Sequence, residues 1–301
     1  MSEESTAFLA IYIITFLIGF PNAVLAFCSC IRKIHRKPLP IDIFMLNLAV
    51  SDLFFLTFLP LKMKEAADDM VWNMPHILCH FSDIMFFFPL YLSSLFLTAI
   101  SAERYVCVAF PVTYKSPKRI IYSTLICVVT WVMFSAFAIF PYKASFLDSD
   151  EADNNTNLLS LDAKPQGCCI NHTAKQLTEL LSVQLSLAVV FFLLPFLICC
   201  FCYISLIRIL IKCPLFKRQR KLRVTGLIVG TLLVFAISFA PYNASQIVGF
   251  IKHEIPNWHM KAFMLNTLNV CFDSIIFFCI SKDMRRAIKV SAKALFSFMP
   301  I

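Results

Sequence analysis

The chain has 301 residues, of which 59% are hydrophobic and only 15% charged, and its formal net charge is +9. A soluble core does not require so many apolar residues, and long unbroken apolar runs indicate a membrane protein. A transmembrane barrel is disfavoured because it would show short segments of alternating hydrophobicity. Apolar helices buried in a soluble protein are the weaker alternative.

Seven segments are long enough for a helix of about 20 mainly apolar residues to cross the hydrocarbon. In chain order they cover residues 7–31, 41–64, 77–108, 121–142, 177–211, 221–251 and 260–281. Short polar links separate them, apart from one longer loop at 143–176. The sequence therefore predicts an all-α membrane protein with a seven-transmembrane helix bundle over 7–281. A tail at 1–6 precedes the bundle, and an amphipathic cytoplasmic helix and tail at 282–301 follow it.

The basic residues predict how the bundle is oriented. If seven helices alternate, the links 32–40, 109–120 and 212–223 share one side with the tail, and all four are rich in Lys and Arg. The opposite side is acidic, and basic links face the cytoplasm. We therefore expect a multi-pass protein of the plasma membrane with an extracellular N-terminus. The net charge then reflects topology and attraction to anionic membrane lipids, and it does not indicate nucleic-acid binding.

The long loop carries two kinds of extracellular feature in this arrangement. Of the 13 cysteines, Cys79, Cys168 and Cys169 face the oxidising outer side. A disulfide from Cys79, at the start of the third segment, to Cys168 would hold the loop over the mouth of the bundle, and Cys169 is the alternative partner. Asn154 and Asn171 begin Asn-X-Thr sequons on the same side, so they are predicted glycosylation sites.

The third segment ends in the stretch AERY, where Glu103, Arg104 and Tyr105 follow a long apolar run. An arginine at mid-bilayer costs about 2.5–3.5 kcal/mol on insertion scales, but at the cytoplasmic boundary its head group reaches water or a carboxylate. An acid beside the arginine forms a pair that can open, as a switch requires. The alternative is a plain anchor whose side chain extends to the interface.

The other six segments each carry one polar, proline or tryptophan landmark: Asn22, Asp52, Trp131, Pro195, Pro241 and Asp273. Together with AERY, this pattern resembles the rhodopsin-like (class A) G-protein-coupled receptors over the whole chain. The resemblance implies a receptor, not an enzyme, that activates a heterotrimeric G protein through Glu103, Arg104 and Tyr105 and needs no cofactor. A seven-helix transporter is the less favoured alternative, because the sequence has only five glycines and no visible repeat.

Five phrases of the sequence, GFPNAVLA, LPLK, FFPLYLSS, AFPVTYK and FAPYNAS, resemble the free fatty acid receptor group more narrowly. That resemblance implies sensing of carboxylates and signalling through Gi/o or Gq proteins. In that group, arginines near the outer ends of the fifth and seventh helices hold the ligand carboxylate. Their positions match Gln184 and His259 here, and Tyr91 and Gln246 match two further polar positions of the same site.

These replacements remove two permanent cations from the implied site. Gln184 offers hydrogen bonds without charge, and His259 is cationic only if its pKa, about 6.5 unperturbed, is raised. Apolar residues that can hold an alkyl chain remain, namely Phe86, Phe87, Phe88, Leu90 and Phe137. We therefore expect a small or lipid-like ligand that is held mostly by apolar contacts and oriented by Tyr91, Gln184, Gln246 and His259.

Asp83 indicates a different class of ligand. It shares a helical face with Phe87 and Tyr91, so it faces the same site if Tyr91 does. A carboxylate there would favour a neutral or cationic ligand over a carboxylate. The alternative is an ion pair with Lys62 of the second segment, or exposure at the mouth of the bundle.

A buried polar cluster is expected from the second, third and seventh segments, at Asp52, Ser93, Asn269 and Asp273. Two carboxylates inside a membrane need a counter-cation or a proton. The class A resemblance implies that an allosteric sodium ion binds among them. A hydrogen-bond network filled with water is the alternative.

Overall fold

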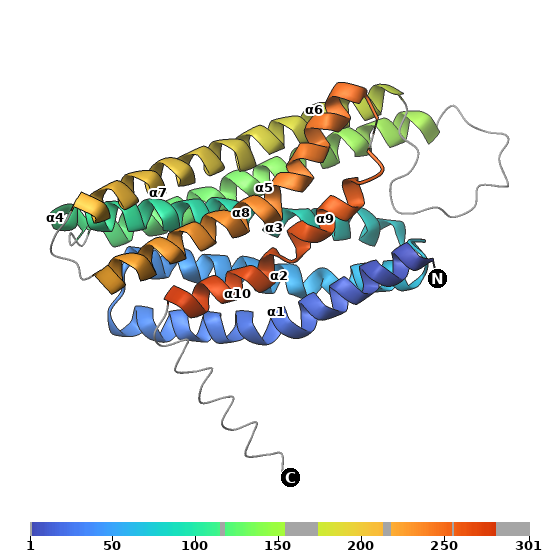
Figure 1. The fold of residues 1–301 in the computed structure, drawn as a ribbon. Coiled ribbons are helices and arrows are strands. Elements are labelled where there is room, and N and C mark those ends of the chain that lie inside the picture. Colours follow the sequence, from blue (N-terminus) through green and yellow to red (C-terminus); the bar gives the residue numbers. More distant parts are fainter. Residues whose placement is uncertain (1, 115–117, 154–173, 213–217, 255, 281–301) are drawn as a thin grey trace, which may run out of the picture.

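The computed structural model describes residues 2–114, 118–153, 174–212, 218–254 and 256–280. All regular structure in these ranges is helical, and the long helices run side by side as a bundle (Figure 1). The first three predicted segments correspond to α1 (Glu3–Arg36), α2 (Pro40–Ala67) and α3 (His76–Ala109). A short helix, α4 (Pro111–Tyr114), follows α3.

The other four predicted segments are helical as well, and two of them are divided. The fourth is α5 (Lys118–Asp153) and the sixth is α8 (Arg218–Lys252). The fifth and seventh consist of consecutive pieces, namely α6 (Ala174–Ala188), the π-helical turn η1 (Val189–Leu193) and α7 (Leu194–Lys212), then α9 (His259–Thr267) and α10 (Asn269–Ile280). The predicted all-α bundle is thus confirmed, while the predicted helix at 282–301 lies outside the described residues.

Helix ends differ from those that hydropathy predicts, because hydropathy detects only the part of a helix that lies in hydrocarbon. α1 begins at Glu3 rather than at residue 7, since the Ser2 hydroxyl caps it by accepting a 3.1 Å hydrogen bond from the Ser5 amide. α5 continues to Asp153, beyond the predicted end at 142. Part of the loop predicted at 143–176 is therefore helical.

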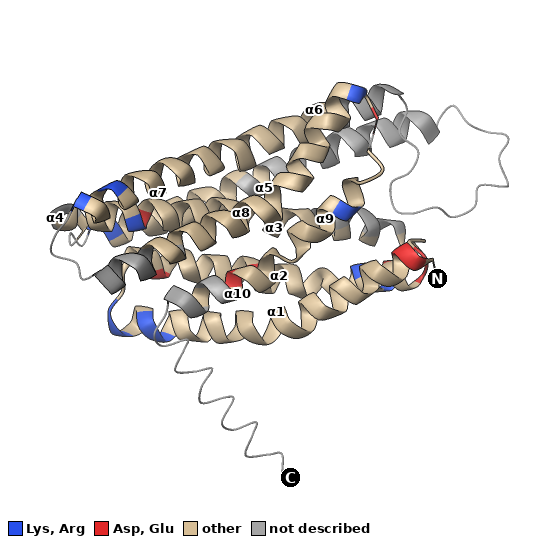
Figure 2. Ribbon diagram, viewed as in Figure 1, with Lys and Arg blue, Asp and Glu red and all other residues tan. Residues whose placement is uncertain are grey.

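The surface of the bundle suits a membrane. Within the described residues, five helical stretches are long and apolar enough to cross one: Glu3–Arg36, Pro40–Ala67, Met85–Ala109, Leu181–Lys212 and Ile228–Lys252. Large apolar side chains such as Leu17, Ile121 and Phe201 point outward and are more than 60% exposed. Figure 2 shows many Lys and Arg residues at the end that carries α4 and the α1–α2 turn, whereas the N-terminus lies at the opposite end. We call these the α4 end and the N-terminal end.

Candidate functional site

Rings from five helices meet in the half of the bundle that holds the N-terminus. We call them the aromatic cluster: Tyr12, Phe55, Phe86, Phe87, Tyr242 and Phe263. The Phe86 ring centroid lies 4.9 Å from that of Phe55 on α2 and 5.1 Å from that of Phe263 on α9. Successive helix residues point about 100° apart, so Phe87 also reaches Tyr242 of α8, on which it stacks at 6.2 Å, while its ring lies 4.7 Å from that of Phe263. The cluster joins α3 to helices on both of its sides.

A buried hydrogen bond between Tyr91 and Gln246 adjoins this cluster. Gln246 Nε2 donates to the Tyr91 hydroxyl at 3.2 Å, and both side chains are at least 95% buried. Tyr91 lies one turn after Phe87 on α3, and Gln246 lies one turn after Tyr242 on α8. Gln246 Oε1 is buried and has no hydrogen-bond partner within the described part of the chain. Such an acceptor is costly unless a water or a ligand donates to it.

His259 is the first residue of α9, just ahead of the predicted membrane segment 260–281. The Ser245 hydroxyl donates to the Tyr242 carbonyl at 2.6 Å, so the 2.8 Å contact between Ser245 Oγ and His259 Nδ1 requires the ring to donate. Nε2 is then the acceptor nitrogen of a neutral imidazole. Burial lowers the pKa of His259 below its usual value of 6.5, which keeps the ring neutral at physiological pH.

The structure brings only some of the predicted site residues together. Four of them lie around Tyr242 and the aromatic cluster. The rings of Phe87 and His259 pack against Tyr242, and the hydrogen-bonded side chains of Tyr91 and Gln246 lie one helical turn away. Gln184 is half-buried on α6, which packs against α8. The side chain of Asp83 lies outside the described residues, so its proposed role in choosing a ligand stays a prediction.

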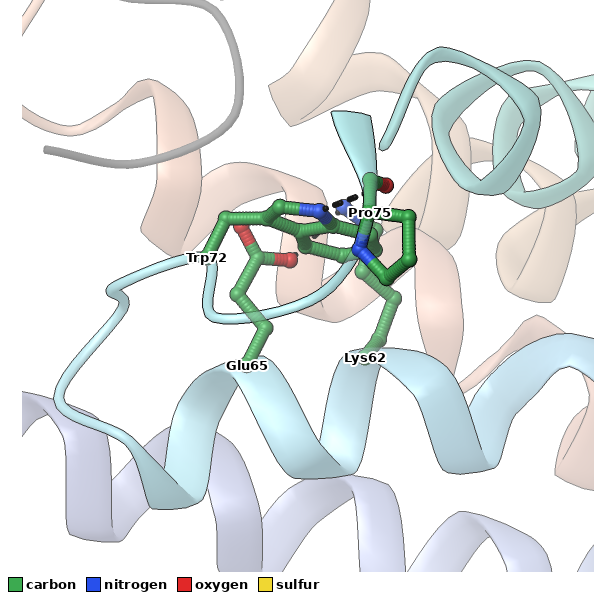
Figure 3. Close-up of polar contacts among 4 residues, drawn as sticks. All are labelled: Lys62, Glu65, Trp72 and Pro75. Atoms are coloured by element: carbon green, nitrogen blue, oxygen red, sulfur yellow. Dashed lines mark hydrogen bonds and ion pairs between the residues drawn. The ribbon is translucent and has the colours of Figure 1, made fainter. Parts of the chain in front are cut away.

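Lys62 forms an ion pair that sequence reasoning missed. Its Nζ lies 2.8 Å from Glu65 Oε2, one helical turn further along α2, and the two side chains are only 11% and 8% exposed. Figure 3 shows both side chains rising from α2 toward the indole of Trp72, which donates a 3.3 Å hydrogen bond to the Pro75 carbonyl. The spacing of three residues was visible in the phrase LPLKMKEAA, but the burial was not.

At the α4 end, Glu103 pairs with a residue other than its neighbour in the AERY stretch. Arg119 at the start of α5 lies 3.2 Å from the Glu103 carboxylate, and the side chain of Glu103 is 9% exposed. The terminal nitrogens of Arg104 are buried and make no hydrogen bond within the described ranges. Arg104 instead lies close enough to Tyr203 of α7 for the two to interact electrostatically. Tyr105 packs edge-on against Phe110 and Phe201.

The predicted polar cluster is assembled at the junction of α9 and α10. Asn269 Nδ2 donates to Asp273 Oδ2 at 2.7 Å, and Asp52 of α2 is close enough to Asp273 for their charges to interact. Ser93 lies beside Asp52 and donates to the Pro89 carbonyl at 2.9 Å. Three buried oxygens have no hydrogen-bond donor among the described residues: Asp52 Oδ1, Asn269 Oδ1 and Asp273 Oδ1.

The predicted extracellular features fall outside the part of the chain that the structure describes. This holds for the side chain of Cys79, for Cys168, and for the sequons at Asn154 and Asn171. The disulfide and the two glycosylation sites therefore stay predictions.

A seven-helix membrane bundle with a polar core and a buried arginine at one end is the architecture of a receptor that couples to G proteins. Comparison with known proteins agrees: the model of the family described as "7 transmembrane receptor (rhodopsin family)" matches residues 21–277. The chain belongs to this family, and it is therefore a receptor rather than an enzyme or a transporter.

Individual relatives place the chain within one branch of the family. It is 38% identical to free fatty acid receptor 3 of Mus musculus over 271 residues, which cover 90% of this chain and 82% of the relative. It is 39% identical to free fatty acid receptor 3 of Homo sapiens, over 89% of this chain and 75% of the relative. Free fatty acid receptor 2 of Mus musculus is 35% identical, over 94% of this chain and 84% of the relative. The chain is thus a receptor of the free fatty acid receptor type.

Proposed function

We propose that this receptor lies in the plasma membrane with its N-terminus outside and detects a fatty-acid-like carboxylate. The observation that carries the proposal is the buried Tyr91–Gln246 hydrogen bond beside the aromatic cluster, at the end of the bundle that would face outward. Its relatives are named for free fatty acids. A site of this kind combines apolar surface with a few polar groups that fix the orientation of a ligand.

The aromatic cluster supplies the apolar contacts for an alkyl chain. Each methylene removed from water contributes about 0.8 kcal/mol, so potency should rise with chain length until the available surface is covered. Tyr91, Gln246 and His259 orient the ligand through hydrogen bonds, and Gln184 adds a neutral amide from α6. The unpaired Oε1 of Gln246 accepts a hydrogen bond from a ligand donor or from a water that accompanies the ligand.

Activation would be passed to a heterotrimeric G protein of the Gi/o or Gq class at the α4 end. Arg104 is the central residue there, because its buried guanidinium becomes available to a partner when the helices separate. The Glu103–Arg119 ion pair joins α3 to α5 in the present structure. Its opening, together with a movement of Tyr105, would accompany that separation.

The polar cluster at the α9–α10 junction fits a sodium ion as an allosteric regulator. Its unpaired atoms, on Asp52, Asn269 and Asp273, are all oxygens, which hard cations prefer. A bound cation would also offset the repulsion between the two carboxylates, while Ser93 would support Asp52. Sodium would then favour the arrangement of helices seen here.

The test of the proposed function is nucleotide exchange on purified Gα proteins in membranes that carry the chain. Carboxylates from two to twelve carbons should stimulate exchange on Gi/o or Gq, with potency that depends on chain length. Matched alkylamines serve as the comparison. A response to amines alone that Asp83→Asn abolishes would instead establish a receptor for cationic ligands.

A further inference from the structure

We infer that Lys62 is the cation that binds the ligand carboxylate, and that Glu65 is an internal competitor which the ligand displaces. This inference rests on the proposed function, because it names the residue that recognises the anion. The sites of the two implied arginines hold Gln184 and His259, and burial keeps His259 neutral. A carboxylate must therefore find its counter-charge elsewhere.

Lys62 is well placed to supply that charge. Among the described Lys and Arg residues near the N-terminal end, its side chain is the most buried at 11% exposed, whereas that of Lys261 is 62% exposed. Its ammonium lies 5.8 Å from the ring centroid of Phe86, a central member of the aromatic cluster. A fatty acid whose alkyl chain packs on that cluster could thus place its carboxylate on Lys62.

Two aromatic rings hold the ammonium group of Lys62 in place without neutralising its charge. Nζ of Lys62 lies 5.8 Å from the centroids of both Trp72 and Phe86, within the range of cation–π attraction. Trp72 belongs to the turn after α2, where Asp69 and Met70 adopt the left-handed conformation with φ of 58° and 62°. That turn folds the indole back over Lys62, which limits access of water and strengthens the pairing of the ammonium with any anion.

The Glu65 carboxylate pairs with Lys62 as a ligand carboxylate would, and it lies near the end of α2, from which we expect a ligand to displace it. Glu65 lies in the last turn of α2, which ends at Ala67, between exposed Lys64 and buried Ala66. We expect a change of its side-chain rotamer, toward the exposed side of Lys64, to move its carboxylate from Lys62 to water when a ligand binds. The ligand must break the buried ion pair between Lys62 and Glu65 to form its own ion pair with Lys62. The strength of the internal pair therefore helps to set the ligand concentration that activation requires.

The experiment measures nucleotide exchange on Gα against concentrations of hexanoate and of the neutral analogue hexanamide. Lys62→Met/Glu65→Gln replaces the pair by neutral residues of similar size, so that neither member of this pair stays charged and buried without the other. Its potency for hexanoate should fall about 10- to 100-fold, the equivalent of one charged hydrogen bond, and its response to hexanamide should not change. Glu65→Gln alone should raise hexanoate potency, and Lys62→Arg should retain it.

The matched control is the exposed ion pair between Lys261 and Glu4, 2.9 Å long, at the same end of the bundle. Lys261→Met/Glu4→Gln should leave hexanoate potency unchanged, because exposed pairs contribute little. If hexanoate activates the double variant at Lys62 and Glu65 with wild-type potency, or if Glu65→Gln lowers potency, the inference is wrong while the proposed function stands. If no carboxylate activates the wild-type receptor, the proposed function fails and the inference fails with it.

Discussion

The hydroxyl of Ser94 on α3 donates a 2.7 Å hydrogen bond to the carbonyl oxygen of Phe191 in η1. In a regular helix that carbonyl would accept from the amide four residues later, but residue 195 is a proline and has no amide hydrogen. The π-helical turn at Val189–Leu193 accommodates the missing bond. A side chain from one helix thereby satisfies the backbone of another in the middle of the bundle.

Ser94→Ala should destabilise the receptor, because it removes a buried hydrogen bond between α3 and the backbone of η1. We expect a loss of about 1–2 kcal/mol in the free energy of unfolding, measured as a lower thermal midpoint in detergent micelles. Ser186→Ala is the control, since Ser186 is exposed and bonds only within α6. Equal midpoints for the two variants would show that the Ser94 bond contributes nothing.

The seven helices were predictable from sequence for a simple reason. In hydrocarbon the backbone must satisfy its own hydrogen bonds, so a sufficiently long apolar segment has almost no choice but to be helical. Beyond the hydrocarbon that constraint ends, which explains why the start of α1 and the end of α5 were misplaced. The π-helical turn was not predicted either, because Pro195 removes a backbone donor without specifying how the helix accommodates the loss, and the hydroxyl of Ser94 that bonds there comes from a different helix.

The candidate site was only partly visible in the sequence. The resemblance to a receptor group placed Tyr91 and Gln246 in one site, and the structure joins them by a hydrogen bond. The spacing of Lys62 and Glu65 could be read from the sequence, but their burial depends on a turn that folds Trp72 over them. The partner of Glu103 was also missed, because Arg119 comes from another helix and the contact depends on how the helices pack.

Acidification from pH 7.5 to 6.5 should not increase the potency of a carboxylate ligand. The pKa of His259 is lowered by burial, so the imidazole stays mostly neutral over this interval. A depressed pKa also means that the neutral ring stabilises the fold above pH 6.5, and that this contribution is lost as the pH falls further. The thermal midpoint of the wild type should therefore decrease below pH 6.5.

His259→Asn is the variant that isolates the contribution of His259 protonation to the pH dependence. The Asn amide can still donate to Ser245 Oγ but cannot be protonated, so its thermal midpoint should depend less on pH below 6.5. Potency that rises on acidification in the wild type and not in His259→Asn would show that the imidazole carries the charge for the ligand.

Arg104→Ala should abolish nucleotide exchange on Gα, both basal and stimulated, while surface expression is largely retained. The terminal nitrogens of Arg104 make no hydrogen bond within the described residues, so the substitution breaks none there. Surface labelling of intact cells provides the control for expression. Normal exchange in this variant would remove Arg104 from the proposed switch.

Sodium chloride should lower basal nucleotide exchange and raise the thermal midpoint more than choline chloride at the same ionic strength. A ligand that binds only the folded, inactive arrangement stabilises it in proportion to the logarithm of its concentration.

Asp52→Asn should remove the difference between the two salts, because it takes away one of the two carboxylates that would hold the ion. Glu3→Gln is the matched control, since Glu3 is an exposed acid in the first turn of α1. The sodium site is ruled out if the two salts act alike on the wild type, and Asp52 has no part in it if its variant still distinguishes them.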